Sequence, residues 1–366
     1  MSRAALVTVL ACVALALPAR AQDSQFGIHG LGTPGRAEGA RARGTAGAFA
    51  PFDAASPLTE APIAGIPRSS IAVMAYTASR DLQFDSGPQA ALRQSRFPTL
   101  VVAWRSPWGG NLSTGFTTYL DRSYQVVMRD SVAVRGVMQP YRDVIVSDGS
   151  VVDLRFAAAR RLSPRLSVGG ALHVMTGSAR VSARRNWDDS VTYRNVLNVD
   201  EVQYNGLGGS VSALATLGGG LRLAGWFRSD TKLKAKVLGQ VTADSDLPMR
   251  GGGGIEWAPA RALRFAGSVQ WAGWEGAPDG HDTFGWAAGL EAGNPNSPLR
   301  LGVRQTTLPF SPTATAPTEL GVTAGFGKGF GGGRARMDFA VERLWRDGPG
   351  LEERVWTFLL GFAIQP

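Results

Sequence analysis

The stretch LRLAGWFRSDTKLKAKV, residues 221–237, constrains the fold most strongly because its charged and apolar side chains alternate. The charges occupy even positions and most of the large apolar side chains occupy odd ones. Successive side chains of a β-strand point to opposite faces, so this stretch predicts a long strand with one charged and one apolar face. Two environments favour such a strand: water outside a protein core, or lipid outside a polar lumen. The alternation by itself leaves both open.

The N-terminus has the pattern of a secretory leader. Arg3 precedes an apolar run from Ala4 to Leu17, and Ala19-Arg20-Ala21 forms a cleavage site, so residues 1–21 are predicted to be a signal peptide. The alternative is a lipoprotein leader in which Cys12 carries lipid, although the apolar run continues beyond this residue. Cys12 is the single cysteine of the sequence, so cleavage leaves an exported chain without thiols or disulfides.

Composition narrows the class of protein. The formal net charge of +9 becomes +7 when Arg3 and Arg20 leave with the leader, which is mildly basic and does not indicate nucleic-acid binding. No stretch of the mature chain reaches the ~18 consecutive apolar residues of a transmembrane helix. Glycine accounts for 47 of 366 residues, well above the ~7% of average usage. An exported, glycine-rich, alternating chain favours an outer-membrane β-barrel.

The pattern divides the mature chain in two. Residues 22–67 are rich in Gly, Ala and Pro without sustained alternation, and we predict that they form an N-terminal plug. Residues 68–366 contain alternating runs separated by turn signals, and the connections alternate between short and long. An even strand number with this sorting of loops predicts an all-β fold, a transmembrane antiparallel β-barrel of about 14 strands. The predicted strands are 69–82, 97–107, 111–127, 148–161, 165–177, 204–217, 220–241, 249–258, 261–274, 282–293, 298–308, 317–328, 333–345 and 353–364.

The alternation predicts which side chains of the wall face lipid and which face the lumen. Leu221, Leu223, Phe227 and Leu233 are assigned to lipid, and the charges of the same strand to the lumen. The last strand has its own lipid-facing stripe of Trp356, Phe358, Leu360, Phe362 and Ile364. The longer connections, including 128–147, 178–203 and 242–248, are predicted to be loops.

Three motifs carry a resemblance to a known family. The strand Trp226-Phe227-Arg228-Ser229 followed by Lys232-Leu233-Lys234, the run Ser268–Trp274, and the strand–turn–strand Ala157–Gly169 are similar to strands of the FadL family of outer-membrane transporters for long-chain fatty acids and other hydrophobic compounds. The resemblance covers essentially the whole mature chain. Arg41–Ala50 resembles the start of the family's plug, and the family's Asn-Pro-Ala signature reads Ser56-Pro57-Leu58 here, without the asparagine.

The resemblance implies a function. It implies a monomeric outer-membrane channel that passes hydrophobic compounds, such as fatty acids or aromatic hydrocarbons, by diffusion, with the plug as gate. It also implies a side opening near the third strand, about 111–127. The partners expected are a hydrophobic small molecule and outer-membrane lipid, with no nucleic acid and no cofactor.

Six residues are predicted to contact substrate. Phe49 and Phe52 belong to the plug, and Arg155, Arg228 and Lys232 have the parity assigned to the lumen. Trp187 lies in the long loop 178–203, which the resemblance relates to an apolar capture groove. Arginine can grip a substrate carboxylate with two hydrogen bonds. The alternative is that these cations belong to a salt-bridge lattice filling a polar lumen.

The sequence gives little support for an enzyme. The three histidines, His29, His173 and His281, show no metal-ligand spacing and no H-E-x-x-H motif. His281-Asp282 could join a serine in a hydrolytic triad, but spacing cannot establish that geometry. We therefore expect no catalytic residues and no metal. Two other functions remain open: a plugged barrel that anchors another exported protein, and a hydrophilic diffusion pore.

Overall fold

The computed structural model describes residues 24–84, 90–189 and 191–365. The predicted leader, residues 1–21, lies outside this part of the chain. Among the described residues, no helix is long and apolar enough to cross a membrane.

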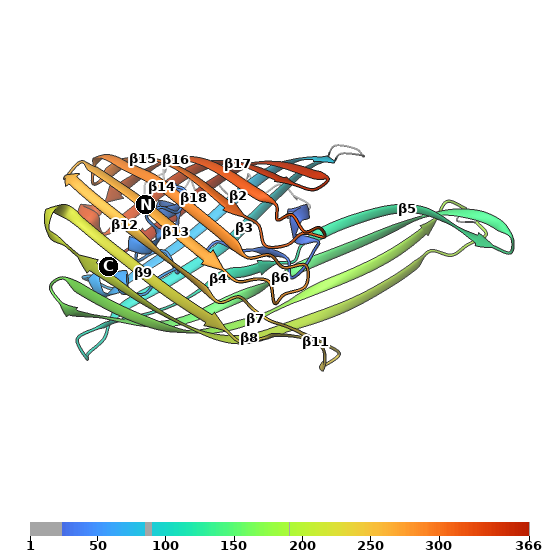
Figure 1. The fold of residues 1–366 in the computed structure, drawn as a ribbon, viewed down its shortest axis with the longest axis horizontal. Helices are drawn as coiled ribbons and strands as arrows, with labels where there is room; N and C mark the ends of the chain where they lie inside the picture. The colour runs from blue at the N-terminus through green and yellow to red at the C-terminus, as the bar shows by residue number, and fades with distance from the viewer. Residues whose placement is uncertain (1–23, 85–89, 190, 366) are drawn as a thin grey trace.

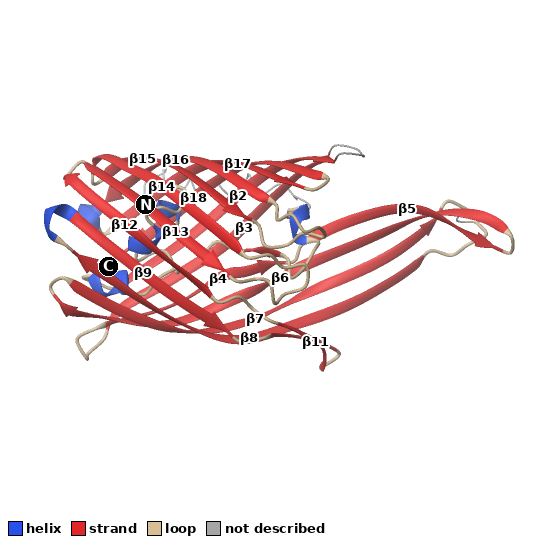
Figure 2. Ribbon diagram, viewed as in Figure 1, coloured by secondary structure: helices blue, strands red, loops and turns tan. Residues whose placement is uncertain are grey.

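The described chain forms one closed antiparallel barrel (Figures 1 and 2). Each strand pairs with its neighbour, and the last strand pairs with the first strand of the wall, with Ile364 opposite Ile71 and Leu351 opposite Phe84. The barrel has 14 strands, as the sequence predicts. Closure leaves the wall without free edges, which is what a sheet in lipid requires. The wall strands are β2 (Ser70–Phe84), β3 (Ala90–Arg105), β4 (Asn111–Asp121), β6 (Val137–Ser163), β7 (Leu166–Trp187), β8 (Val196–Thr216), β9 (Leu221–Asp230), β12 (Arg250–Ala260), β13 (Leu263–Ala272), β14 (Thr283–Asn294), β15 (Ser297–Thr307), β16 (Thr318–Phe330), β17 (Ala335–Gly348) and β18 (Leu351–Ile364).

The wall alternates as expected for a barrel in lipid. On β18 the residues Trp356, Phe358, Leu360, Phe362 and Ile364 are all exposed on the outer surface, while their neighbours Val355, Thr357 and Leu359 are buried. On β9, Leu223 and Phe227 are likewise exposed, and Arg228, which follows Phe227 on the opposite face, is buried. The outward position of the apolar stripe predicted for the last strand is therefore confirmed.

Two segments predicted to be loops are strands. β5 (Tyr124–Val134) forms a hairpin with the first part of β6, turning at Arg135 and Gly136, which both have positive φ. β7 and β8 remain paired from the barrel out to Arg185 and Val196. We call β5 with residues 137–149, 178–187 and 196–205 the projecting sheet, and Figure 1 shows it extending far beyond the rest of the wall. The predictions of loops at 128–147 and 178–203 were wrong because polar composition was taken for irregular structure, whereas strand pairing continues there.

The strand predicted over 220–241 is interrupted. Asp230 pairs with Gly208, and Lys234 of β10 (Leu233–Val237) pairs with Asn205. Four residue steps on this chain therefore match three steps on β8, which leaves one extra residue between β9 and β10. The extra residue is a bulge that moves the following side chains to the opposite faces. Leu233 is therefore only 3% exposed and packs in the interior with Tyr204 and Leu247. The prediction that Leu233 faces lipid was wrong, and β11 (Gln240–Ser245) pairs back onto β10 where a loop was expected in part.

The N-terminal segment, residues 24–67, contributes short elements. They are η1 (Gln25–Gly27), β1 (Thr33–Pro34), α2 (Ala40–Arg43), η2 (Ala50–Phe52) and η3 (Ala61–Gly65). α2 contacts β16, β17 and β18, while η3 contacts β4, β6, β7 and β8, so the segment meets the wall on several sides. β1 pairs with the end of β4. The segment therefore lies inside the barrel.

Candidate functional site

The N-terminal segment packs tightly on the inner face of the wall. Phe49 is fully buried and packs with Ala266 of β13 and Ala287 of β14. Phe52 packs with Leu214 of β8. Small wall residues make this approach possible, because a Cβ at Gly302 would lie 2.3 Å from the Thr45 carbonyl carbon. Both phenylalanines predicted to contact substrate are thus packed between the segment and the wall.

Buried ion pairs attach the segment to the wall. Arg43 Nε donates to Glu342 Oε1 at 2.6 Å, and Arg36 Nη1 donates to the same oxygen at 3.0 Å. On another side, Arg41 Nε donates to Glu291 Oε2 at 3.0 Å. The Glu342 side chain is fully buried. Charges this deeply buried require partners, so the segment and the wall neutralise each other.

A second attachment involves Glu60. Its carboxylate accepts hydrogen bonds from Ser210 Oγ at 2.7 Å and Ser212 Oγ at 2.6 Å. Arg155, predicted to contact substrate, donates from Nη2 to the Thr59 carbonyl oxygen at 2.9 Å and lies 3.4 Å from Glu60 Oε1. The structure places Arg155 in this lattice between wall and segment.

Arg228, also predicted to contact substrate, is paired with wall carboxylates. Its Nε donates to Asp230 Oδ1 at 2.8 Å and its Nη1 donates to Asp153 Oδ2. The Asp153 side chain also lies 2.9 Å from His173 Nδ1. Both predicted arginines thus donate to protein groups, as the salt-bridge interpretation of the lumen expects, although Arg155 Nε is buried without a hydrogen-bond partner among the described residues.

The same lattice contains Asp153, His173 and Ser210 in the order of a hydrolytic triad. His173 Nε2 lies 2.8 Å from Ser210 Oγ. Each of the three is at most 8% exposed, and Ser210 Oγ is also hydrogen-bonded to Glu60. Both hydrogen-bond partners of the Ser210 hydroxyl belong to the protein, so the arrangement is a buried hydrogen-bond chain. The described residues contain no group of His, Cys, Asp and Glu that could hold a metal ion.

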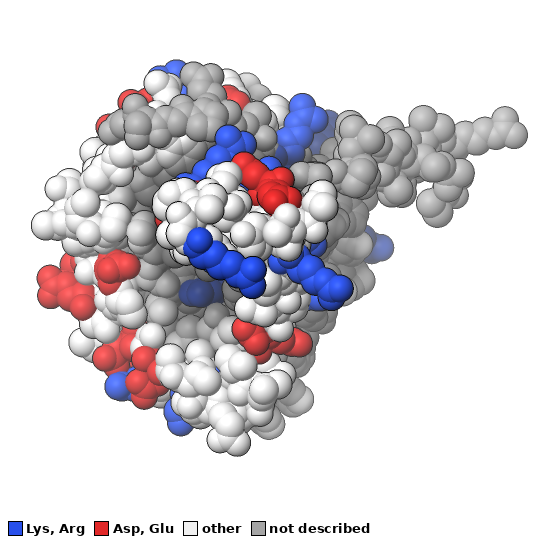
Figure 3. All heavy atoms as spheres, turned by 90° about the vertical axis from the view of Figure 1, so that its right-hand side faces the viewer, with Lys and Arg blue, Asp and Glu red and all other residues white. Residues whose placement is uncertain are grey.

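The remaining two predicted residues lie toward the projecting sheet. The Lys232 ammonium is 3.7 Å from carboxylate oxygens of Asp244 and Asp246, and its side chain is 53% exposed. Trp187 packs against Tyr141 and Tyr193, with ring centroids 5.6 Å and 5.1 Å apart. Seen from this end, the molecule presents Lys and Arg interspersed with Asp and Glu (Figure 3). None of the six predicted residues lines the chamber that lies between the N-terminal segment and strands β9 and β12–β17.

A chamber of about 160 Å³ lies between the N-terminal segment and the wall strands β9 and β12–β17. Its apolar lining comes from Leu58 of the segment, Trp226 of β9, and Trp274, Leu308 and Pro309 of the connections beyond β13 and β15. Trp274 is held by an edge contact with Phe310, at 5.1 Å between ring centroids. We call this chamber of about 160 Å³ the Trp226 chamber. Its polar lining includes the arginines Arg36, Arg250, Arg304 and Arg346 and the acids Glu38 and Glu319.

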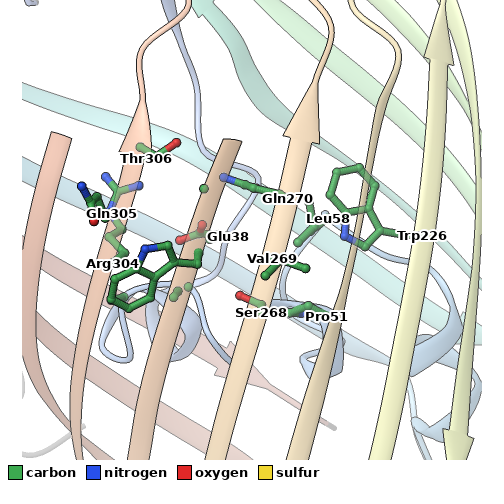
Figure 4. A pocket seen from close by; sticks show the side chains of 15 residues that line it. Glu38, Pro51, Leu58, Trp226, Ser268, Val269, Gln270, Arg304, Gln305 and Thr306 are labelled. Carbon is green, nitrogen blue, oxygen red and sulfur yellow. The ribbon is translucent and has the colours of Figure 1, made fainter. Parts of the chain in front are cut away.

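A smaller recess adjoins the Trp226 chamber and shares part of its lining (Figure 4). Figure 4 shows Arg304 and Glu38 on one side of this recess and Trp226 on the other. Sequence analysis missed these residues as a site. Trp226 carried a usable signal, because its even position in β9 places a large aromatic ring among the lumenal charges.

A second chamber, of about 220 Å³, lies where β2 begins and β18 ends. Ala40 and Ile66 of the segment, Met74 of β2, Val101 of β3 and Ala363 of β18 are among its lining residues. The N-terminal segment contributes lining residues to both chambers.

Comparison with known proteins places the fold. No protein-family model and no curated protein matches the chain. Solved structures do match. A Pseudomonas aeruginosa FadL homologue has a TM-score of 0.62 at 11% identity, covering 91% of this chain and 99% of that one. The CymD monoaromatic hydrocarbon channel has a TM-score of 0.56 at 12% identity, over 91% and 98%. The P. putida toluene transporter TodX has a TM-score of 0.59 at 11% identity, over 90% and 99%. The chain therefore has the fold of FadL-type channels, as the resemblance in its strands predicts.

Proposed function

We propose that this protein is an outer-membrane channel through which hydrophobic compounds pass by diffusion. One observation carries the proposal: a chamber lined in part by aromatic side chains lies inside a closed barrel, and large apolar side chains cover the outer face of that barrel. Concave apolar sites with a few polar groups are the usual binding sites for small molecules. The titles of structures with the same fold name a monoaromatic hydrocarbon channel and a toluene transporter, which supports the same class of cargo here.

We further propose that the N-terminal segment is the gate. It lines both chambers, so its movement would open or close a path between them for a bound compound. Arg43–Glu342 and Arg41–Glu291 would have to separate or shift in such a motion. The protein would act as a monomer in the outer membrane, exported by its leader and surrounded by lipid.

A disulfide between segment and wall tests the gate. A Cβ placed on Gly44 would lie 3.6 Å from Cβ of Ala340 in β17, within the ~3.5–4.5 Å range of disulfides. In cells that express the full chain, the variant Gly44→Cys with Ala340→Cys should take up labelled toluene much more slowly than Ala340→Cys alone. Reduction with dithiothreitol should restore the rate.

The other outcomes separate the alternatives. Uptake that is unchanged in the oxidised double variant would show that the segment does not gate. Absence of uptake and of ligand binding in the unmodified protein would favour an anchor for another exported protein. Large ion conductance in a planar bilayer would indicate a hydrophilic pore.

A further inference from the structure

The arginines of the Trp226 chamber are each paired with a carboxylate of the protein, and one of these carboxylates, Glu319, itself lines the chamber. Arg304 Nη2 donates to Glu319, and Arg250 Nη2 donates to Asp230 Oδ2 at 3.1 Å. The ring of Tyr119 adds a second contact to Arg250, whose guanidinium carbon lies 4.8 Å from the ring centroid. These guanidinium groups are therefore held in place before any ligand arrives.

One donor on each of three arginines is left over. The Nε atoms of Arg36, Arg250 and Arg304 are buried, and among the described residues none of them has a hydrogen-bond partner. Arg304 as a whole is only 7% exposed. A buried donor without an acceptor is costly, more so when the group carries a charge, and such groups in native proteins require an explanation. All three residues line the Trp226 chamber, so an acceptor inside the chamber would explain them.

The kind of acceptor follows from the donors. Arginine is charged at all accessible pH values and has no acceptor atom, so its complement is an anion or a strongly polar oxygen. A carboxylate offers two oxygens with several lone pairs and can bridge more than one N–H donor. A hydrocarbon without an oxygen would leave all three donors unsatisfied.

The size and walls of the chamber limit the remainder of the ligand. Its volume of about 160 Å³ is close to the ~150 Å³ of a protein cavity that holds one benzene molecule. Drug-sized ligands occupy pockets of ~300 Å³ or more, so a long-chain fatty acid does not fit. Trp226 and Trp274 provide flat apolar surfaces against which an aromatic ring can pack.

We propose that the Trp226 chamber binds a small aromatic carboxylate, with the ring against Trp226 and Trp274 and the carboxylate accepting from Arg250 and Arg304. This inference rests on the proposed channel function and narrows its cargo from hydrophobic compounds in general to small, singly charged aromatic acids. The carboxylate would supply the acceptor that the buried Nε–H groups lack.

Titration calorimetry on the purified full-length protein in detergent tests the inference with three probes: benzoate, toluene and hexadecanoate. Benzoate and toluene share a ring, and benzoate and hexadecanoate share a carboxylate. Benzoate should bind about tenfold or more tightly than toluene, the size expected for a hydrogen bond to a charged group. Hexadecanoate should not compete with benzoate.

The variant Arg250→Lys retains a positive charge beside Asp230 and removes the Nε donor. We expect it to weaken benzoate binding about tenfold and to leave toluene binding unchanged. The matched control is Arg222→Lys. Arg222 lies on β9, has a lumenal position like that of Arg250 and pairs with Glu256, but it does not line the chamber. Trp226→Ala should weaken benzoate and toluene together.

The outcomes distinguish this inference from the proposed function. If toluene binds as tightly as benzoate or more tightly, and Arg250→Lys has no effect, the proposal of a carboxylate ligand is wrong, while the proposed channel function is unaffected. Hexadecanoate competing with benzoate would overturn the size limit. Binding of none of the three probes by folded protein would overturn the channel proposal itself. If Arg250→Lys fails to fold, the comparison of the three probes on the unmodified protein still decides.

Discussion

Strands β6, β7 and β8 pass through two environments, first the barrel wall and then the projecting sheet. Within the wall their alternation is strict: Phe156 is 55% exposed on the outer surface, and its neighbour Arg155 is 3% exposed in the lumen. In the projecting sheet Arg142 is exposed and its neighbour Asp143 is partly exposed. The same backbone pairing thus continues while the contrast between the faces is lost.

The difference shows that the environment, and not the strand, decides what alternation means. In the wall, arginines such as Arg155 and Arg228 face a lumen that supplies carboxylates, because the outer face is lined by apolar side chains. Beyond the wall, charges such as Arg185 and Asp143 pair at the surface with side chains 38% and 21% exposed. Surface pairs contribute little to stability, and breaking buried pairs is costly.

The largest expected effect comes from removing a buried carboxylate inside the barrel, compared with removing a surface carboxylate in the projecting sheet. Glu342→Gln would leave Arg43 and Arg36 without a full counter-charge in a buried site, and should lower the free energy of unfolding by about 3–5 kcal/mol. The matched variant Asp143→Asn breaks the surface pair with Arg185 and should cost less than ~1 kcal/mol. Urea unfolding of both variants in detergent micelles measures the difference. Equal losses would contradict the view that only the interior lattice is stabilising.

A smaller effect is expected from adding a charge to the outer face. Val211 and Val199 are both exposed on the same face of β8, with Val211 in the wall and Val199 in the projecting sheet. Val211→Arg should destabilise the barrel by ~2–4 kcal/mol if the site is near the middle of the bilayer, and Val199→Arg by less than ~0.5 kcal/mol. Unfolding from lipid vesicles checks both. A large loss at Val199 would place the projecting sheet in lipid.

The smallest effect concerns pH. The hydrogen bonds from Arg185 hold the pKa of Asp143 below its ordinary value. A carboxylate with a lowered pKa in the folded protein stabilises it at pH above the ordinary value of about 4, and this contribution is lost as the pH falls through the lowered pKa. Amide hydrogen exchange around Arg185 should therefore become slightly faster only under strongly acidic conditions. In Asp143→Asn the rates should lack this acid step.

Much of the barrel could be predicted from the sequence, because alternation has a period of two that survives without any knowledge of neighbours. The stripe on β18 and the outward positions of Leu223 and Phe227 follow from it directly. Leu233 could not be placed in this way. One extra residue relative to β8 reverses the faces, and the extra residue is visible only when the two strands are paired.

The binding site was the least predictable part. Arg228 and Arg250 are both arginines with lumenal positions, and they lie opposite each other in the register of β9 and β12. Whether an arginine keeps a donor for a ligand depends on which carboxylates lie within reach. Arg228 Nε is used by Asp230, while Arg250 Nε has no partner among the described residues.

By itself, the sequence predicted an exported chain and determined that it forms a barrel of alternating strands and which face of most strands points outward, because these follow from local order along the chain. Only the tertiary structure decided that the strands of the projecting sheet continue beyond the wall, that Leu233 turns inward, and that the Trp226 chamber lies against the N-terminal segment. Each of these depends on residues far apart in the sequence. Thr33 to Glu38 meet Trp226, Arg250 and Arg304 only once the barrel has closed around the segment.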